Sequence, residues 1–156
     1  GGEIAQRIGA EFVRLDLADA DSIAAGIRQA AECLGGRIDC LILNAGIADD
    51  AGPAEHLDLE VLRRVFEINV FGVAQALRDG IAFMRSGGSV IVTSSPTATE
   101  LMPGVAAYGA SKAAVNALVR TAAIELGPRG ILVNAVLPVV IETEIAFYPQ
   151  NSSAKL

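Results

Sequence analysis

Three side chains stand at a spacing that supports proton transfer at an alcohol or a carbonyl group. They are Ser95, Tyr108 and Lys112, in the order Ser-x12-Tyr-x3-Lys. Tyr108 and Lys112 lie four positions apart, so on a helix their side chains share one face. A phenol with an ordinary pKa of about 10 is a weak acid–base catalyst near neutral pH, but a nearby ammonium lowers that pKa. The pair therefore predicts a tyrosine that acts as general acid or base.

The serine of this set follows a predicted strand. Residues 89–93 are an apolar, β-branched run, which is typical of a buried parallel strand. A residue just beyond the carboxyl end of such a strand faces the crevice where open α/β sheets bind ligands. We therefore expect the Ser95 hydroxyl to hold the oxygen atom of a substrate.

Predicted strands and helices alternate along the chain. The strands are predicted at residues 12–15, 40–43, 89–93 and 131–136, and the helices at 3–8, 22–34, 58–85 and 105–126. Capping aspartates at Asp19 or Asp21 and glycines after the helices mark several of the ends. This alternation predicts a doubly wound, Rossmann-like parallel sheet with helices on both faces, a three-layer α/β/α arrangement. Residues 1–150 are interpreted as one partial domain, and 151–156 as a tail or linker without fold information.

At this point the chain resembles the short-chain dehydrogenase/reductase family. The active site of that family contains a serine, a Tyr-x-x-x-Lys pair and an asparagine on a preceding helix, which match Ser95, Tyr108, Lys112 and Asn69. The resemblance spans residues 11–143. It implies an NAD(P)-dependent oxidoreductase that interconverts an alcohol and a carbonyl, with Asn69 holding a water of the proton relay.

The resemblance also implies a set of cofactor-binding residues. The run Asn44-Ala45-Gly46 matches a family turn that supports the central sheet and the adenosine end of the cofactor. Asp16 matches the acidic residue placed against the adenine amino group, and Lys112 also holds the ribose. The segment that passes the nicotinamide contains three further candidates: Pro138, Ile141 and Thr143. The cofactor is NAD or NADP, and the sequence does not distinguish them.

Two family features are missing from this sequence. Family members begin with a strand, a glycine-rich turn and a helix that hold the cofactor pyrophosphate. No such turn is found here, so we expect a preceding βαβ unit of about 30 residues or more, whose strands lie between residues 12–15 and 40–43. The family's substrate lid and closing strand are also missing. Pro138-Val139 stands where the family usually has Pro-Gly.

Composition narrows the class of protein. The 156 residues have a net charge of −6, which disfavours electrostatic binding to nucleic acid or an anionic membrane. No apolar run approaches the length of about 18 residues expected for a membrane helix. Cys33 and Cys40 are interpreted as buried free thiols, and His56 as a surface residue without metal-ligand neighbours. The chain is predicted to be cytoplasmic, without a metal.

Two alternatives to an active oxidoreductase stay open. The first is a catalytically inactive remnant that serves only as an oligomerising scaffold, because the family's long helices pack in homodimers and homotetramers. Small residues on the helix at 105–126 suit such packing. The second is an epimerase or dehydratase of the related extended family, but the large carboxyl-terminal domain that it requires is not in this sequence. The substrate class is a small alcohol or ketone, whose identity the sequence does not fix.

Overall fold

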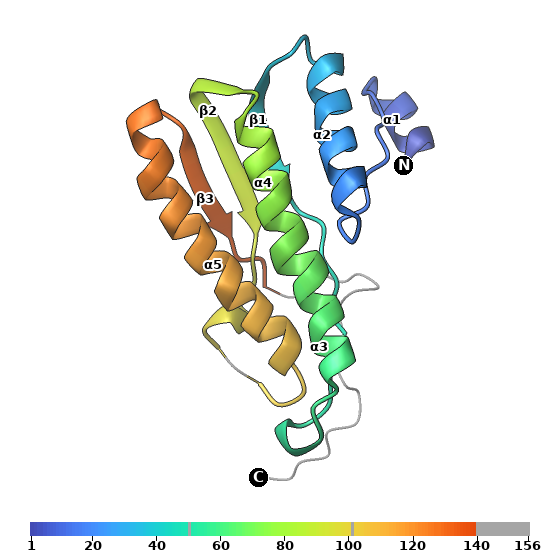
Figure 1. Ribbon diagram of the computed structural model, residues 1–156, viewed down its shortest axis with the longest axis vertical. Helices are drawn as coiled ribbons and strands as arrows, with labels where there is room; N and C mark the ends of the chain where they lie inside the picture. Colours follow the sequence, from blue (N-terminus) through green and yellow to red (C-terminus); the bar gives the residue numbers. More distant parts are fainter. Residues whose placement is uncertain (50, 101, 140–156) are drawn as a thin grey trace.

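A three-stranded parallel sheet forms the centre of the protein (Figure 1). The computed structural model describes residues 1–49, 51–100 and 102–139. Its strands are β1 (Ile38–Leu43), β2 (Met84–Thr93) and β3 (Leu132–Val136), hydrogen-bonded in the order β1-β2-β3. This parallel sheet with crossover helices confirms the prediction of an incomplete Rossmann-like α/β fold.

The helices begin and end largely where local signals predict. They are α1 (Gly2–Ile8), α2 (Ala20–Cys33), α3 (Leu59–Phe66), α4 (Val73–Ile81) and α5 (Ala106–Leu126), with a π-helical turn η2 (Glu67–Gly72) between α3 and α4. Short 3-10 turns are η1 (Ala54–His56), η3 (Pro96–Ala98) and η4 (Gly127–Arg129). Asp19 and Asp58 cap α2 and α3 by accepting hydrogen bonds from backbone N–H groups of the first turn. Gly9, in the left-handed region at φ 68°, ends α1.

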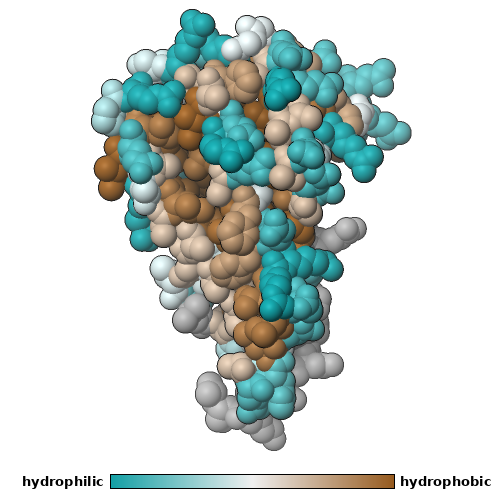
Figure 2. All heavy atoms as spheres, viewed as in Figure 1, coloured by the Kyte–Doolittle hydropathy of each residue, from teal (hydrophilic) through white to brown (hydrophobic). Residues whose placement is uncertain are grey.

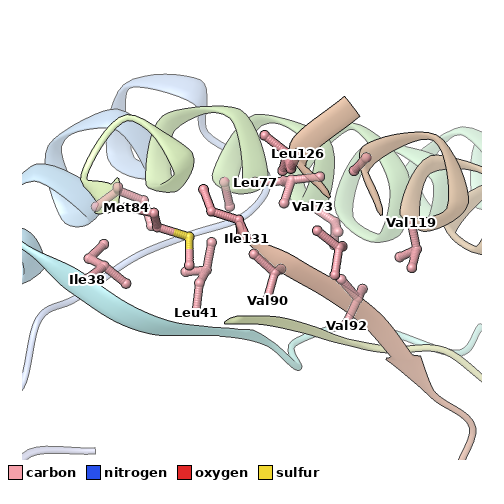
Figure 3. Close-up of a cluster of buried hydrophobic side chains, with 14 of the residues drawn as sticks. Ile38, Leu41, Val73, Leu77, Met84, Val90, Val92, Val119, Leu126 and Ile131 are labelled. Atoms are coloured by element: carbon pink, nitrogen blue, oxygen red, sulfur yellow. The ribbon is translucent and has the colours of Figure 1, made fainter. Parts of the chain in front are cut away.

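All the helices that cover the sheet lie on one face (Figure 1). The chain steps from β1 to β2 through α3 and α4, and from β2 to β3 through α5, always in the same direction across the sheet. Because such crossovers are right-handed, they place their helices on the same side. Figure 3 shows the result: helices above the strands and apolar side chains between them.

The core fills the space between this helical layer and the sheet. Leu41, Val90 and Val92 point from β1 and β2 towards Leu77 of α4 and Val119 of α5 (Figure 3). Both valines of β2 are almost fully buried. Burial of each such side chain contributes about 1.5–3 kcal/mol to the free energy of unfolding, so these side chains stabilise the packing of α4 and α5 on the sheet.

In the described residues the helical layer covers one face of the sheet, which is the incomplete form of the Rossmann-like fold that the sequence predicts. The opposite face of the sheet is open, with the side chains of Ile42 and Leu132 exposed by 62% and 64%. Helices on that face require strands on the far side of β1 and steps in the opposite direction. The described part of the chain supplies no such strand, so this face of the sheet is uncovered there.

The prediction of a strand at residues 12–15 is wrong. This segment has no regular secondary structure, and Phe12 is 55% exposed. A strand needs a neighbour that completes its backbone hydrogen bonds. In the described residues β1 pairs only with β2, so residues 12–15 have no strand beside them that could complete their backbone hydrogen bonds.

The end of the long helix differs from its prediction. The helical stretch ends at Ile81 instead of near Arg85, and β2 begins at Met84 instead of Ser89. Met84 pairs with Ile38, and the register is irregular between that pair and the regular ladder that follows. Gly87, at φ 86°, lies in this irregular part. Gly87 and Gly88, which follow the predicted helix at residues 58–85, therefore lie at a bend in a strand instead of ending a helix.

The two cysteines are free, as predicted, but both are exposed rather than buried. Cys40 lies two residues before Ile42, and side chains at that spacing share a face of a strand, here the open one. His56 is exposed, which confirms its prediction as a surface residue. None of the helices in the described ranges has the length and apolarity needed to span a bilayer.

Gly72 allows the helical layer to approach the segment before α2. A Cβ atom at this buried glycine would collide with the backbone carbonyl oxygen of Leu17. We expect Gly72→Ala to lower the free energy of unfolding by about 1–3 kcal/mol, because backbone must shift to relieve the overlap. Urea denaturation measures this. The matched control is Gly127→Ala, where the added methyl meets nothing within 4 Å; equal losses in both variants would contradict the packing explanation.

Candidate active site

The carboxyl ends of β1 and β2 meet at one edge of the sheet. Asn44 follows β1 directly, and Thr93 is the last residue of β2. The Thr93 hydroxyl donates a hydrogen bond to Asn44 Oδ1 over 2.9 Å. The family turn that begins at Asn44 is therefore tied to the strand that leads to Ser95.

Lys112 extends from α5 to this edge. Its side chain is buried, and Nζ donates a hydrogen bond of 2.8 Å to the carbonyl oxygen of Thr93. The same nitrogen lies 5.6 Å from the centroid of the Tyr108 ring. The two side chains thus share a face of α5, as their spacing requires, and the ammonium lies over the aromatic ring.

Two uncharged groups, the Thr93 carbonyl and the Tyr108 ring, stabilise the ammonium of Lys112. None of the ion pairs in the described ranges includes this residue. Burial lowers the pKa of the Lys112 ammonium below its usual value of 10.5, because the charged form loses hydration. The Thr93 carbonyl uses one of three N–H donors, which leaves two for a ligand in the part of the chain that the structure describes.

Asn69 is fully buried in the π-helical turn η2. Its amide oxygen accepts from the Ile47 N–H at 2.9 Å, and its amide nitrogen donates to the Ile47 carbonyl at 2.8 Å. The nitrogen also donates to Ser111 Oγ at 3.1 Å. Both N–H donors are thereby used, and one lone pair of Oδ1 remains to accept a proton donor such as water. Single π turns inside helices are frequent at functional sites.

Gly46 brings the Asn44-Ala45-Gly46 turn against Asn69 and Lys112. A Cβ atom at this position would lie 3.0 Å from Asn69 Oδ1 and 3.4 Å from Lys112 Nζ. A glycine is therefore required by close approach rather than by a left-handed backbone. The Lys112 ammonium and the Asn69 amide oxygen border the same small space.

Ser95 follows the end of β2 as the N-cap of η3. Its Oγ accepts hydrogen bonds from the backbone N–H of Thr97 at 3.2 Å and from the Thr97 hydroxyl at 2.9 Å. The η3 turn packs against α5, the helix that contains Tyr108 and Lys112. The preceding hydroxyl, Ser94, lies 3.4 Å from the Lys112 carbonyl and fastens the same loop to α5.

The remaining predicted cofactor residues are placed less centrally. Asp16 is exposed and makes local hydrogen bonds: its carboxylate accepts from the Ala18 N–H, and its N–H donates to Ser22 Oγ. Pro138 is half-buried after β3, and the Val139 side chain beside it is exposed. Ile141 and Thr143 lie outside the described residues. The binding roles of these four residues stay predictions.

Sequence reasoning missed several groups at this edge. Ser111 donates to the Tyr108 carbonyl at 2.7 Å and accepts from Asn69, so it links two catalytic candidates. Its position three residues after Tyr108 was a signal for such a bond. Thr97 carries a similar signal, two residues after Ser95. The contacts of the Thr93 carbonyl and of the Ile47 peptide group could not be predicted, because every residue type has these backbone groups.

These residues define a class: a Rossmann-like α/β protein with a serine, a Tyr-Lys pair and a buried asparagine at the carboxyl edge of its sheet. A family model described as enoyl-(acyl carrier protein) reductase matches residues 2–155. With its relatives and structural neighbours, this match shows that the chain belongs to the short-chain dehydrogenase/reductase family.

Individual relatives agree with this assignment. The cis-4-hydroxycyclohexanecarboxylate dehydrogenase of Sinomonas cyclohexanicum is 38% identical over 136 residues, which cover 86% of this chain and 54% of the relative. A dehydrogenase/reductase structure from Sinorhizobium meliloti 1021 matches with a TM-score of 0.85 and 34% identity, covering 92% of this chain and 57% of that one. A short-chain dehydrogenase from Burkholderia cenocepacia J2315 in complex with NADP matches with a TM-score of 0.84 and 31% identity, covering 92% of this chain and 59% of that one. The chain spans about half the length of the curated relatives that it matches.

The buried ammonium predicts a pH-dependent stability. Because the folded pKa of Lys112 is lowered, the unfolded chain binds more protons than the folded chain between that pKa and 10.5. The free energy of unfolding of the wild type, relative to Lys112→Met, should therefore rise as the pH increases through this window and be constant below it. Each unit of lowering corresponds to about 1.4 kcal/mol. Urea denaturation of both proteins from neutral to alkaline pH measures the difference, and parallel curves would contradict the effect of burial.

Proposed function

We propose that the protein containing this chain is an NAD(P)-dependent oxidoreductase that interconverts an alcohol and a carbonyl. The observation that supports this most directly is the buried Lys112 ammonium, held between the Thr93 carbonyl and the Tyr108 ring at the carboxyl edge of the sheet. A buried cation that has no carboxylate partner among the described residues is costly to keep, which favours a functional over a purely structural role.

Four side chains divide the work in this proposal. Ser95 binds the substrate oxygen, and the Tyr108 hydroxyl gives that oxygen a proton during reduction or takes one during oxidation. Lys112 places a positive charge beside the phenol, and its free N–H donors bind ribose hydroxyls. Asn69 holds a relay water through the remaining lone pair of its amide oxygen. Hydride is supplied or accepted by the nicotinamide cofactor when it is bound.

The residues present fit one half of such a cofactor. Within the described residues Lys112 has two N–H donors left for ribose hydroxyls, and Gly46 keeps the adjacent turn free of a side chain. The Val139 side chain, at the position where the family usually has a glycine, is exposed. The pyrophosphate of a dinucleotide needs a glycine-rich turn or a helix N-terminus, and this sequence has no such turn. We therefore assign only the nicotinamide-ribose side to these residues, with either NAD or NADP as the cofactor.

A secondary alcohol or its ketone is the substrate class that we propose. The relative from Sinomonas cyclohexanicum is named for a cyclic hydroxy acid, and the Burkholderia cenocepacia structure contains NADP. Neither name fixes the substrate of this protein. The first assay therefore offers cis-4-hydroxycyclohexanecarboxylate with NAD and with NADP, and follows the absorbance of the reduced nicotinamide.

Removal of one hydroxyl group tests the acid–base assignment. We expect Tyr108→Phe in the full-length protein to lower kcat at least about a hundredfold, because the ring keeps its contact with Lys112 but has no proton to transfer. The dissociation constant of the reduced cofactor should stay within about twofold, as a titration of its fluorescence shows. Turnover at the wild-type rate in this variant would refute the role of Tyr108.

A second candidate function is an oligomerising scaffold without catalysis. Apolar side chains gather along the middle of the helical face over α4 and α5 (Figure 2). Phe71 of η2 and Ile124 of α5 are exposed by 60% and 78%, which suits an interface in a homodimer or homotetramer. Cofactor titration separates the two functions. A fluorescence change at micromolar protein favours the enzyme, whereas no response from a stable oligomer favours the scaffold.

We also propose a cytoplasmic location. Cys33 and Cys40 are exposed and free in the structure. Exposed thiols persist in a reducing compartment and are oxidised in a secretory one. Labelling of intact cells with a thiol reagent that cannot cross membranes tests this, since it should leave both cysteines unmodified.

A further inference from the structure

The Ser95 hydroxyl is held by a residue that has no assigned role. Thr97, two positions further along the chain, directs both its backbone N–H and its hydroxyl at Ser95 Oγ, at 3.2 Å and 2.9 Å. Ser95 is buried with an exposed fraction of 7%, so water competes little for these bonds. Two donors from one residue therefore converge on the oxygen that we assign to substrate binding.

This arrangement limits what Ser95 can do. A hydroxyl group has one proton to donate and two lone pairs that accept. The two donors of Thr97 occupy both lone pairs, and the proton of Ser95 is all that remains for a substrate. Ser95 is thereby restricted to hydrogen-bond donation, which suits a carbonyl oxygen or the alkoxide that develops from it. Hydrogen bonds accepted by a hydroxyl also polarise its own O–H bond and strengthen its donation.

We propose that Thr97 is a positioning residue that fixes Ser95 as a hydrogen-bond donor to the reacting oxygen. The proposal deepens the oxidoreductase function and rests on it. Thr97 itself need not touch the substrate: it acts through Ser95 Oγ. The transition state, in which negative charge grows on the substrate oxygen, gains more from this fixed donor than the ground state does.

A matched control lies in the same turn. Thr99 is also a threonine of the loop after β2, but its hydroxyl donates to the Pro96 carbonyl at 3.2 Å and not to Ser95. Thr99→Val therefore removes a hydroxyl that stabilises the loop backbone alone. Thr97→Val removes a hydroxyl of nearly equal shape that reaches the catalytic serine.

The experiment compares three variants of the full-length protein. With cis-4-hydroxycyclohexanecarboxylate as probe, Thr97→Val should lower kcat about three- to tenfold, the value of one hydrogen bond, with the cofactor dissociation constant unchanged. Thr97→Ser keeps the hydroxyl and should retain the wild-type kcat, as should Thr99→Val. An equal loss of kcat in Thr97→Val and Thr99→Val, or wild-type kcat in Thr97→Val, would overturn the proposal.

A double-mutant cycle shows whether the effect passes through the serine. In a Ser95→Ala background, Thr97→Val should lower kcat/KM no further, because the hydroxyl that it orients is gone. An additional loss of the same size in that background would assign Thr97 a separate role and overturn the proposal. If the wild type oxidises the probe with neither NAD nor NADP and gives no fluorescence response to the reduced cofactors, the oxidoreductase function itself fails. If the wild type is active and Thr97→Val has the same kcat, only the inference about Thr97 is refuted, and the oxidoreductase function stands.

Discussion

A buried positive charge at the carboxyl edge of the sheet imposes the main constraint on this structure. Removing an ammonium from water costs several kcal/mol unless dipoles or counter-charges replace the lost hydration. For Lys112 the replacement consists of the Thr93 carbonyl and the face of the Tyr108 ring. Both groups must be in place for the charge to be tolerated, so β2 and α5 cannot shift independently. The position of Tyr108 is thus coupled to the backbone that leads to Ser95.

A chain of hydrogen bonds extends the same coupling to the helices α3 and α4. The Tyr108 carbonyl can only accept, so Ser111 donates to it and is left to accept from Asn69. Asn69 in turn donates to the carbonyl of Ile47 and accepts from its N–H. Every donor has one possible partner, and this fixes the orientation of the Asn69 amide. The amide oxygen of Asn69 lies beside Gly46 and Lys112.

Local sequence signals predicted most of the helices. The predictions that proved wrong depend on contacts with segments far away in the sequence. Asp19 and Gly9 mark helix ends through contacts within a few residues, and such contacts can be recognised in a sequence. In the part of the chain that the structure describes, the segment at residues 12–15 has the composition of a strand but lacks a neighbouring strand, and Cys40 lies on a face of the sheet that no helix covers. At the site, the spacing of Tyr108 and Lys112 predicted a shared helix face. The Thr93 carbonyl escaped prediction because every residue type has one.

The site is insensitive to the open face of the sheet, and this explains why its geometry is well formed although the fold is incomplete. The hydrogen bonds of Asn69 and Lys112 end on Ile47, Ser111 and Thr93, all on β2, α5 or the loop after β1. These elements are held together by the core on the helical side. The bare side of β1 contributes to none of them. The arrangement of Tyr108, Lys112 and Asn69 is therefore a property of the helical layer and the strand ends, whereas Asp16 follows a segment that has no strand to pair with in the described residues.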